Sequence, residues 1–166
     1  MNNNFPLYTT DYISGVMSLR KPQEKSLKIL EEIVNNVMPC KGMDLKAALG
    51  TVRAMYPTCS DFEHDFMSLT FALATGVGKT RLMGAFITYL YTRHGIGNFF
   101  VVAPNTTIYD KLKRDLSDNN SAKYVFKGLG CFSAPMQIIT DEVYREKSLS
   151  LFESDVRIFV YNIDKF

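Results

Sequence analysis

The sequence predicts an α/β fold with a three-layer α/β/α arrangement, in which helices cover both faces of a parallel sheet. Two observations support this prediction. From residue 67 onward, short apolar segments typical of buried strands alternate with segments of helical periodicity. A Gly-rich turn at residues 75–80 joins the first such strand to the first such helix. Strands that alternate with helices are joined by right-handed crossovers, which place the strands in parallel.

Two helices are expected before this α/β part. Pro22 suits the first position of a helix, and apolar residues then recur at helical spacing. Asp44 is a suitable N-cap for a second helix that runs to Met55. We therefore expect a helical N-terminal segment over residues 1–60 and a partial α/β domain over residues 61–166.

The α/β part is expected to contain two helices and five strands. The first helix covers residues 81–94, has Arg93 and His94 in its last turn and ends at Gly95. The second begins near Thr107, which would form a capping box with Asp110. The expected strands cover residues 67–74, 99–103, 124–126, 136–139 and 157–161. Because the last strand reaches almost to the final residue, we expect the chain to stop inside its domain.

Composition sets limits on the function. The chain is 46% hydrophobic and 22% charged, and its net charge of +2 does not by itself indicate a nucleic-acid-binding protein. Cys40, Cys59 and Cys131 lie far apart, which fits reduced thiols better than a disulfide framework or a zinc site. No secretion signal and no apolar run of about 18 residues is visible. We expect a cytoplasmic protein that does not enter a membrane.

Residues 75–80, Thr-Gly-Val-Gly-Lys-Thr, have the chemistry of a phosphate-binding loop, or P-loop. Gly76 and Gly78 allow backbone angles closed to other residues and leave room for a phosphate. The N–H groups of the turn and of the following helix can then point at phosphate oxygens. Lys79 offers a positive charge to the β and γ phosphates, and Thr80 offers a hydroxyl to Mg²⁺.

This loop departs from the general pattern Gly-x-x-x-x-Gly-Lys-Ser/Thr, because Leu73 stands where the first glycine would fall. One class of P-loop motor instead uses Ala-Thr-Gly-x-Gly-Lys-Thr, which matches residues 74–80. A turn without a ligand is the alternative interpretation. A dinucleotide-binding fold is disfavoured, because it needs an acid at the end of the next strand, where this chain has Pro104-Asn105.

Four stretches between residues 19 and 166 resemble the superfamily 2 (DEAD/DEAH-type) helicases, and among them the Res subunit of type III restriction enzymes. The first is residues 19–23, Leu-Arg-Lys-Pro-Gln, and the second is the P-loop. The third, residues 99–107, looks like motif Ia, and the fourth, residues 156–166, contains Asn-x-x-x-Phe after a strand. The resemblance implies a P-loop NTPase domain of the RecA-like kind, in which ATP hydrolysis with Mg²⁺ drives movement along double-stranded DNA in a restriction system.

The resemblance also implies roles for individual residues. Gln23 would read the adenine edge with its amide, and Lys79 would be the catalytic lysine. Thr80 would hold Mg²⁺, and the turn of motif Ia would contact DNA. The further partner would be the modification or specificity subunit of a restriction system. The candidate nucleotide-binding residues are Gln23, Thr75, Gly76, Val77, Gly78, Lys79, Thr80 and Arg81, and the candidate DNA-binding residues are Pro104, Asn105 and Thr106.

The Asp-Glu-x-His motif of the family, whose acids hold Mg²⁺ and activate water, is not visible. Asp141-Glu142 lacks the histidine and precedes the last expected strand, so we interpret it as a solvated acidic pair. The isolated chain is therefore expected to bind nucleotide weakly and to hydrolyse little. Two other classes of function stay open: a P-loop kinase, and a non-catalytic DNA-binding or assembly module with a vestigial P-loop.

Overall fold

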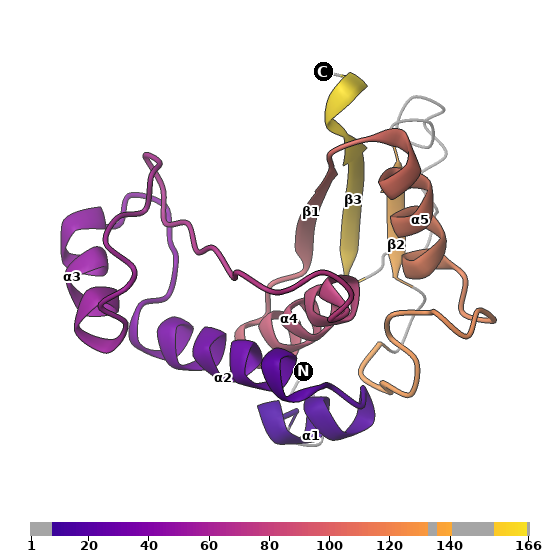
Figure 1. Cartoon of the computed structure of the whole chain (residues 1–166), viewed down its shortest axis with the longest axis horizontal. Coiled ribbons are helices and arrows are strands. Elements are labelled where there is room, and N and C mark those ends of the chain that lie inside the picture. Colours follow the sequence, from indigo (N-terminus) through magenta and orange to yellow (C-terminus); the bar gives the residue numbers. More distant parts are fainter. Residues whose placement is uncertain (1–7, 133–135, 141–154, 166) are drawn as a thin grey trace.

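A three-stranded parallel sheet forms one part of the molecule. The structure is a computed structural model that describes residues 8–132, 136–140 and 155–165. The strands are β1 (Asn98–Ala103), β2 (Gln137–Thr140) and β3 (Arg157–Asn162), in the order β1-β3-β2 (Figure 1). Both β1 and β2 pair with β3 in parallel. The predicted α/β class with a parallel sheet is confirmed, as are the strands expected over residues 99–103, 136–139 and 157–161, within one residue at each end.

Helix α5 (Thr106–Ser117) covers one face of this sheet and contacts all three strands. Its buried side chains Tyr109, Leu112 and Leu116 belong to one cluster with Ile158 and Val160 of β3. The crossover from β1 through α5 explains why these strands are parallel, because a helix must carry the chain back to the start of the sheet.

The opposite face of the sheet is aromatic and open. Side chains alternate between the faces of a strand, so Val101 of β1 is buried while its neighbours Phe100 and Val102 are 69% and 55% exposed. The Phe100 ring stacks on that of Phe159 in β3, with 4.6 Å between the ring centroids. These cross-strand contacts support the register, in which Phe100 and Phe159 are direct partners.

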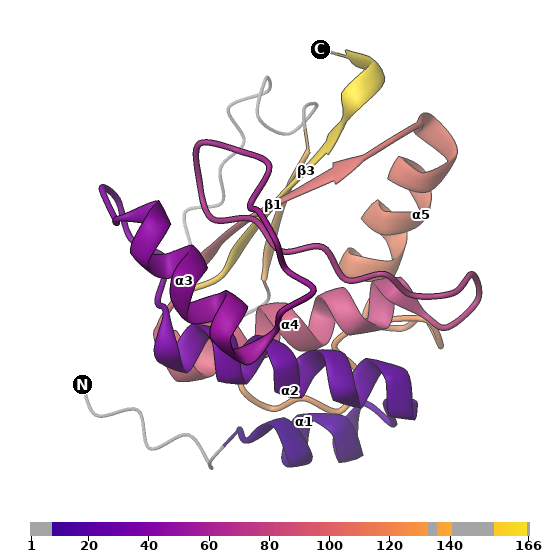
Figure 2. The ribbon, with the colours of Figure 1, turned by 60° about the vertical axis from the view of Figure 1, so that its left-hand side comes forward.

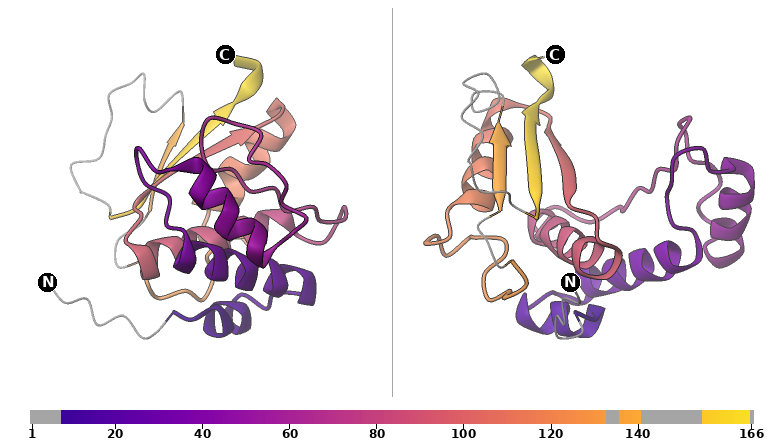
Figure 3. Two further views of the ribbon diagram at one scale, coloured as in Figure 1. Left: turned by 90° about the vertical axis from the view of Figure 1, so that its left-hand side faces the viewer. Right: turned by 180° about the vertical axis from the view of Figure 1, so that it is seen from behind.

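Four helices form the other part of the molecule: α1 (Thr10–Val16), α2 (Lys21–Asn36), α3 (Leu45–Met55) and α4 (Lys79–His94). Helix α2 packs on α4, and α1 packs on both (Figures 1 and 3). The two helices expected before the α/β part are confirmed as α2 and α3. The side chain of Asp44 caps α3, as predicted, by accepting hydrogen bonds from the backbone N–H groups of Lys46 and Ala47. Helix α1 was not predicted.

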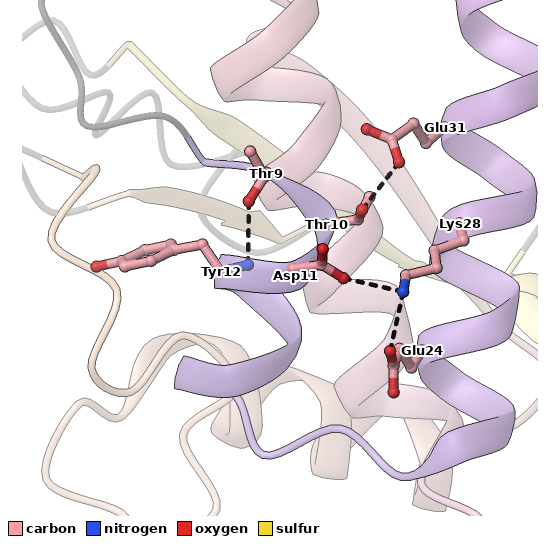
Figure 4. Close-up of polar contacts among 7 residues, drawn as sticks. All are labelled: Thr9, Thr10, Asp11, Tyr12, Glu24, Lys28 and Glu31. Atoms are coloured by element: carbon pink, nitrogen blue, oxygen red, sulfur yellow. Dashed lines mark hydrogen bonds and ion pairs between the residues drawn. The ribbon is translucent and has the colours of Figure 1, made fainter.

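Polar contacts tie α1 to α2 (Figure 4). Thr10 donates a 2.8 Å hydrogen bond to Glu31, and Thr10 is buried. Lys28 lies 2.9 Å from Asp11 and 3.1 Å from Glu24. The two ion pairs are exposed and add little stability. The buried threonine therefore fixes the position of α1 more firmly than the charges do.

Helix α4 ends as the sequence predicts. Gly95 adopts a left-handed conformation with φ of +68°, and its N–H donates to the carbonyl of Tyr91. The Gly95 bond reaches four residues back, as in the αL motif that ends many helices, and the N–H of Ile96 donates to the carbonyl of Leu90.

Two predicted strands are absent from the described residues. The segment 67–74 is extended, but it pairs with no strand in the described part of the chain. Its alternate side chains Leu69, Phe71 and Leu73 pack against the core, so its apolar character comes from side-chain packing without backbone pairing. Residues 124–126 form a turn in which Val125 and Phe126 are buried. Burial inside a turn and burial in a strand give the same apolar signal.

One cluster of buried side chains contains residues from both sides of the predicted domain boundary at residue 60. It includes Leu27 and Leu30 of α2, Leu82 and Ala85 of α4, and Ile158 of β3. A shared cluster does not decide where one domain ends and the next begins, so the boundary at residue 60 stays a prediction. Among the residues that the structure describes, no helix has the length and apolarity needed to cross a membrane.

Gly84 of α4 is expected to tolerate no side chain. A Cβ there would lie 2.0 Å from Cγ1 of Val125, whereas a Cβ at Gly50 of α3 would meet nothing within 4 Å. Gly84→Ala should lower the free energy of unfolding by about 1–3 kcal/mol through overpacking. Gly50→Ala should raise it by up to about 1 kcal/mol, because alanine favours a helix. Urea denaturation of both variants checks this, and a stabilising Gly84→Ala would contradict the close packing of α4 on the 124–126 turn.

His94 is expected to make stability depend on pH. Burial, and then the neighbouring Arg93, lower the pKa of His94 below its ordinary value of 6.5. The unfolded chain then binds more protons, so the free energy of unfolding should fall as the pH drops from about 7.5 to about 5.5. His94→Gln should reduce this slope, while His64→Gln, at an exposed position, should leave it in place. Urea denaturation across this pH range gives the measurement, and equal slopes in wild type and His94→Gln would refute it.

Candidate nucleotide-binding site

The Gly-rich turn leads directly into α4. Gly76 and Gly78 have φ of +80° and +95°, so both occupy the left-handed region that favours glycine. Gly78 is the N-cap of α4, and its carbonyl accepts hydrogen bonds from the N–H groups of Arg81 and Leu82. The helix begins at Lys79, two residues before the predicted start. Lys79 and Thr80 therefore belong to its first turn.

The first turn of α4 can accept an anion. Within the described part of the chain, the backbone N–H groups of Lys79 and Thr80 donate to no protein acceptor. The first turn contains no acidic residue. Unpaired N–H groups and the helix dipole both favour a negative charge at this end of a helix. The geometry thus fits a phosphate at the loop.

The two side chains predicted to contact phosphate and Mg²⁺ lie at the mouth of the loop. The Nζ atom of Lys79 donates a 3.2 Å hydrogen bond to the carbonyl of Ala74, and Lys79 is exposed. Thr80 is half-buried. A bound phosphate could replace the Ala74 carbonyl as the partner of the lysine, because a charge-assisted hydrogen bond is stronger than one to a neutral carbonyl.

Gln23 lies against the loop, 55 residues away in sequence, and only 1% of it is exposed. Its Nε2 donates a 2.8 Å hydrogen bond to the carbonyl of Gly78. Its Oε1 accepts a 2.7 Å hydrogen bond from the N–H of Arg20. Both ends of the amide are therefore bound to backbone. Each end of the amide keeps one further donor or acceptor site, but the side chain is buried, so reading adenine would require Gln23 to become accessible, and that role stays a prediction.

Two arginines connect the same elements. Nη1 of Arg20 donates a 3.2 Å hydrogen bond to the carbonyl of Gly76 in the loop. Nη1 of Arg81, predicted to bind nucleotide, donates a 2.6 Å hydrogen bond to the carbonyl of Met17 at the end of α1. No role was predicted for Arg20. Its position in Leu-Arg-x-x-Gln could have indicated this contact, because Arg20 lies three residues before Gln23 and therefore on the same side of the helix start.

A cavity of about 340 Å³ adjoins the loop segment. Helix α2 contributes Pro22, Lys25 and Ser26 to its lining, and the extended segment before the loop contributes residues 69–73. Gln23 does not line it. The cavity shows that the extended segment and α2 are not packed together along their whole length.

The predicted DNA-binding turn is ordered by an asparagine. Asn105 is the N-cap of α5, and its Oδ1 accepts a 2.9 Å hydrogen bond from the N–H of Ile108. The helix thus begins at Thr106, and the capping box expected from Thr107 and Asp110 is wrong. Asn105 bonds the N–H three residues later, that of Ile108, whereas Thr107 would have bonded that of Asp110, so the cap lies two residues earlier than predicted. Pro104, Asn105 and Thr106 are all exposed.

Asn162, at the end of β3, connects two of the stretches that carry the family resemblance. It is 2% exposed, and its Nδ2 donates a 3.1 Å hydrogen bond to the hydroxyl of Thr106. Its Oδ1 accepts from the N–H of Asp164. The asparagine of Asn-x-x-x-Phe therefore holds the start of α5, a role that the sequence did not indicate.

The structure does not bring the two predicted sites together. The 104–106 turn lies at the end of β1 that is remote from α4, as the different views agree (Figures 1 and 2). No group of three or more His, Cys, Asp or Glu side chains in the described residues could hold a metal ion. Asp141 and Glu142 lie outside the described residues.

A parallel sheet, with a Gly-x-Gly-Lys-Thr turn at the start of a helix, is the combination found in the P-loop NTPase fold. A profile of the family described as "Type III restriction enzyme, res subunit" matches residues 16–166. The chain belongs to this family, which implies a helicase-like, ATP-dependent motor domain. No curated protein and no solved structure matches the chain.

Asn105 and Thr107 offer a matched test of the cap. Asn105→Ala removes the acceptor of the Ile108 N–H and should lower the free energy of unfolding by about 1 kcal/mol. Thr107→Ala, at an exposed position inside the helix, should change it little. Urea denaturation of the two variants distinguishes the caps, and a larger loss in Thr107→Ala would restore the predicted capping box.

Proposed function

We propose that this chain provides the ATP-binding part of the motor of a DNA helicase or translocase subunit in a restriction endonuclease. In the full protein, ATP hydrolysis would drive movement along double-stranded DNA. The observation that supports this most directly is the loop itself, with two left-handed glycines, free N–H groups and Lys79 at the start of α4. The family match over residues 16–166 supports the class of motor.

The loop residues would share the work of holding the triphosphate. Lys79 would leave the Ala74 carbonyl and contact the β and γ phosphates, where it would stabilise the charge that develops in hydrolysis. Residues 75–78 would supply further N–H groups, and Arg81 would contribute only by giving up the bond from its N–H to the Gly78 carbonyl. Thr80 would offer one oxygen to Mg²⁺, a fit for a cation that takes one or two protein ligands and completes its shell with phosphates and water. The bound cation would neutralise charge on the phosphates.

Base selection and DNA contact belong to the same proposal. Gln23 would select adenine once its amide turns to the base, because an amide can pair with both a donor and an acceptor of adenine. The 104–106 turn, with the helix start behind it, would contact the DNA backbone. A modification or specificity subunit would supply recognition of the DNA sequence.

A vestigial loop is the second candidate, and one observation favours it. The charged end of Lys79 and both ends of the Gln23 amide already have partners within the protein. A chain that serves only in DNA binding or assembly would keep these contacts permanently. The two candidates differ in what the loss of Lys79 does.

Lys79→Ala should weaken the binding of Mg-ATP by about 1.5–3 kcal/mol, the range for a hydrogen bond to a charged group. Lys46→Ala removes the same charge from an exposed site on α3 and should leave binding unchanged. Isothermal titration calorimetry of the wild type and both variants gives the comparison. Unaltered binding in Lys79→Ala would favour the vestigial loop.

Parallel titrations with Mg-GTP test whether the site distinguishes adenine from guanine. Tighter binding of ATP than of GTP by the wild type would support selection of adenine. Equal binding would keep the loop as a phosphate site and remove the adenine-reading role from Gln23.

A further inference from the structure

The first turn of α2 holds the phosphate loop by two side chains. Arg20 donates from Nη1 to the carbonyl of Gly76, and Gln23 donates from Nε2 to the carbonyl of Gly78. We call these two contacts the loop clasp. They span 56 and 55 residues of sequence and grip carbonyls on both sides of Val77.

The clasp fixes the directions of the N–H groups that a phosphate would use. In a trans peptide, the carbonyl of one residue and the N–H of the next point to opposite sides. When Arg20 holds the Gly76 carbonyl toward α2, the N–H of Val77 is turned away from α2. The Gln23 contact acts in the same way on the N–H of Lys79, where it adds to the bonds that the Gly78 carbonyl accepts from the N–H groups of Arg81 and Leu82. At 3.5 Å, the bond from the Val77 N–H to the Ala74 carbonyl is too long to fix this peptide by itself.

Further hydrogen bonds and burial hold the two clasp residues in place. The Gln23 side chain is buried, and its Oε1 also binds the N–H of Arg20, so the two clasp residues hold each other. Arg81 of α4 binds the Met17 carbonyl just before α2, at 2.6 Å. The approach at Gly78 is close, because a Cβ there would lie 2.8 Å from Nε2 of Gln23. Small movements of α2 would therefore reach the loop.

We propose that Arg20 and Gln23 are positioning residues that keep the loop in the shape that receives a triphosphate, whatever the base. This inference rests on the proposed function, in which the loop binds nucleotide. It gives Gln23 a task that does not depend on adenine. Without the clasp, the peptides that follow Gly76 and Gly78 are held less firmly and must be ordered when the triphosphate binds, and that ordering costs affinity.

The test compares variants that remove one contact each. Arg20→Ala removes the contact to Gly76, and Arg20→Lys keeps a donor that can reach the same carbonyl. Gln23→Met keeps the size of the side chain and removes both hydrogen bonds. Lys21→Ala is the matched control, because it removes a positive charge from the adjacent, exposed position. Circular dichroism establishes that each variant is folded.

Two readouts separate positioning from simple attraction of charge. The first is the set of ¹⁵N order parameters of residues 75–80 in the protein without nucleotide, which should fall in Arg20→Ala and Gln23→Met and not in Lys21→Ala. The second is the affinity for ATP, GTP and inorganic tripolyphosphate, each with Mg²⁺. Arg20→Ala and Gln23→Met should each lose about tenfold for all three ligands, which is the upper part of the range for one ordinary hydrogen bond, and Arg20→Lys should regain part of the loss.

Three results would overturn the proposal. Unchanged order parameters in both Arg20→Ala and Gln23→Met would show that the contacts do not hold the loop. Equal losses of affinity in Lys21→Ala and Arg20→Ala would show an effect of charge alone. A loss in Gln23→Met for ATP only would make Gln23 a reader of the base. If the wild type binds none of the three ligands while the order parameters still fall in the two clasp variants, the proposed function fails and the clasp stands.

Discussion

The turn from the extended segment into α4 is the constraint on which the rest of the site depends. Gly76 and Gly78 must both adopt positive φ angles for this turn to form. Such a turn leaves its backbone groups without the partners that a helix or a sheet would provide. The carbonyls of Gly76 and Gly78 are bound by side chains at the start of α2, and the N–H groups of Lys79 and Thr80 donate to no acceptor in the described part of the chain. Under the proposed function, the same contacts that stabilise the fold also prepare the site for a phosphate.

A second turn that precedes a helix, between β1 and α5, is also held by side chains. The turn between β1 and α5 is closed by Asn105, and it is held from β3 by the buried Asn162. Both sites therefore use an amide side chain from a distant segment to fix a turn that precedes a helix. An amide suits this task because it can donate and accept at once without carrying a charge into a buried position.

The parts that could be predicted from the sequence are those set by local physics. Helix periodicity and caps such as Asp44 and Gly95 predicted the bounds of the helices to within a few residues. The two glycines of the loop predicted the positive φ angles found there. Contacts between distant segments could not be read in this way. The bond from Arg20 to Gly76, and the absence of a partner for residues 67–74 among the described strands, depend on how elements pack. The apolar character of a segment indicates that it is buried, but it does not indicate which other elements the segment packs against.

The most direct test of the account is to observe where Mg-ATP acts on the chain. In nuclear magnetic resonance spectra of the ¹⁵N-labelled protein, added Mg-ATP should shift the backbone N–H signals of residues 76–80. The side-chain amide of Gln23 should shift with them, because it is bonded to the Gly78 carbonyl. Saturating Mg-ATP that leaves these signals in place, or that shifts only signals elsewhere, would contradict the assignment of this loop as the nucleotide site.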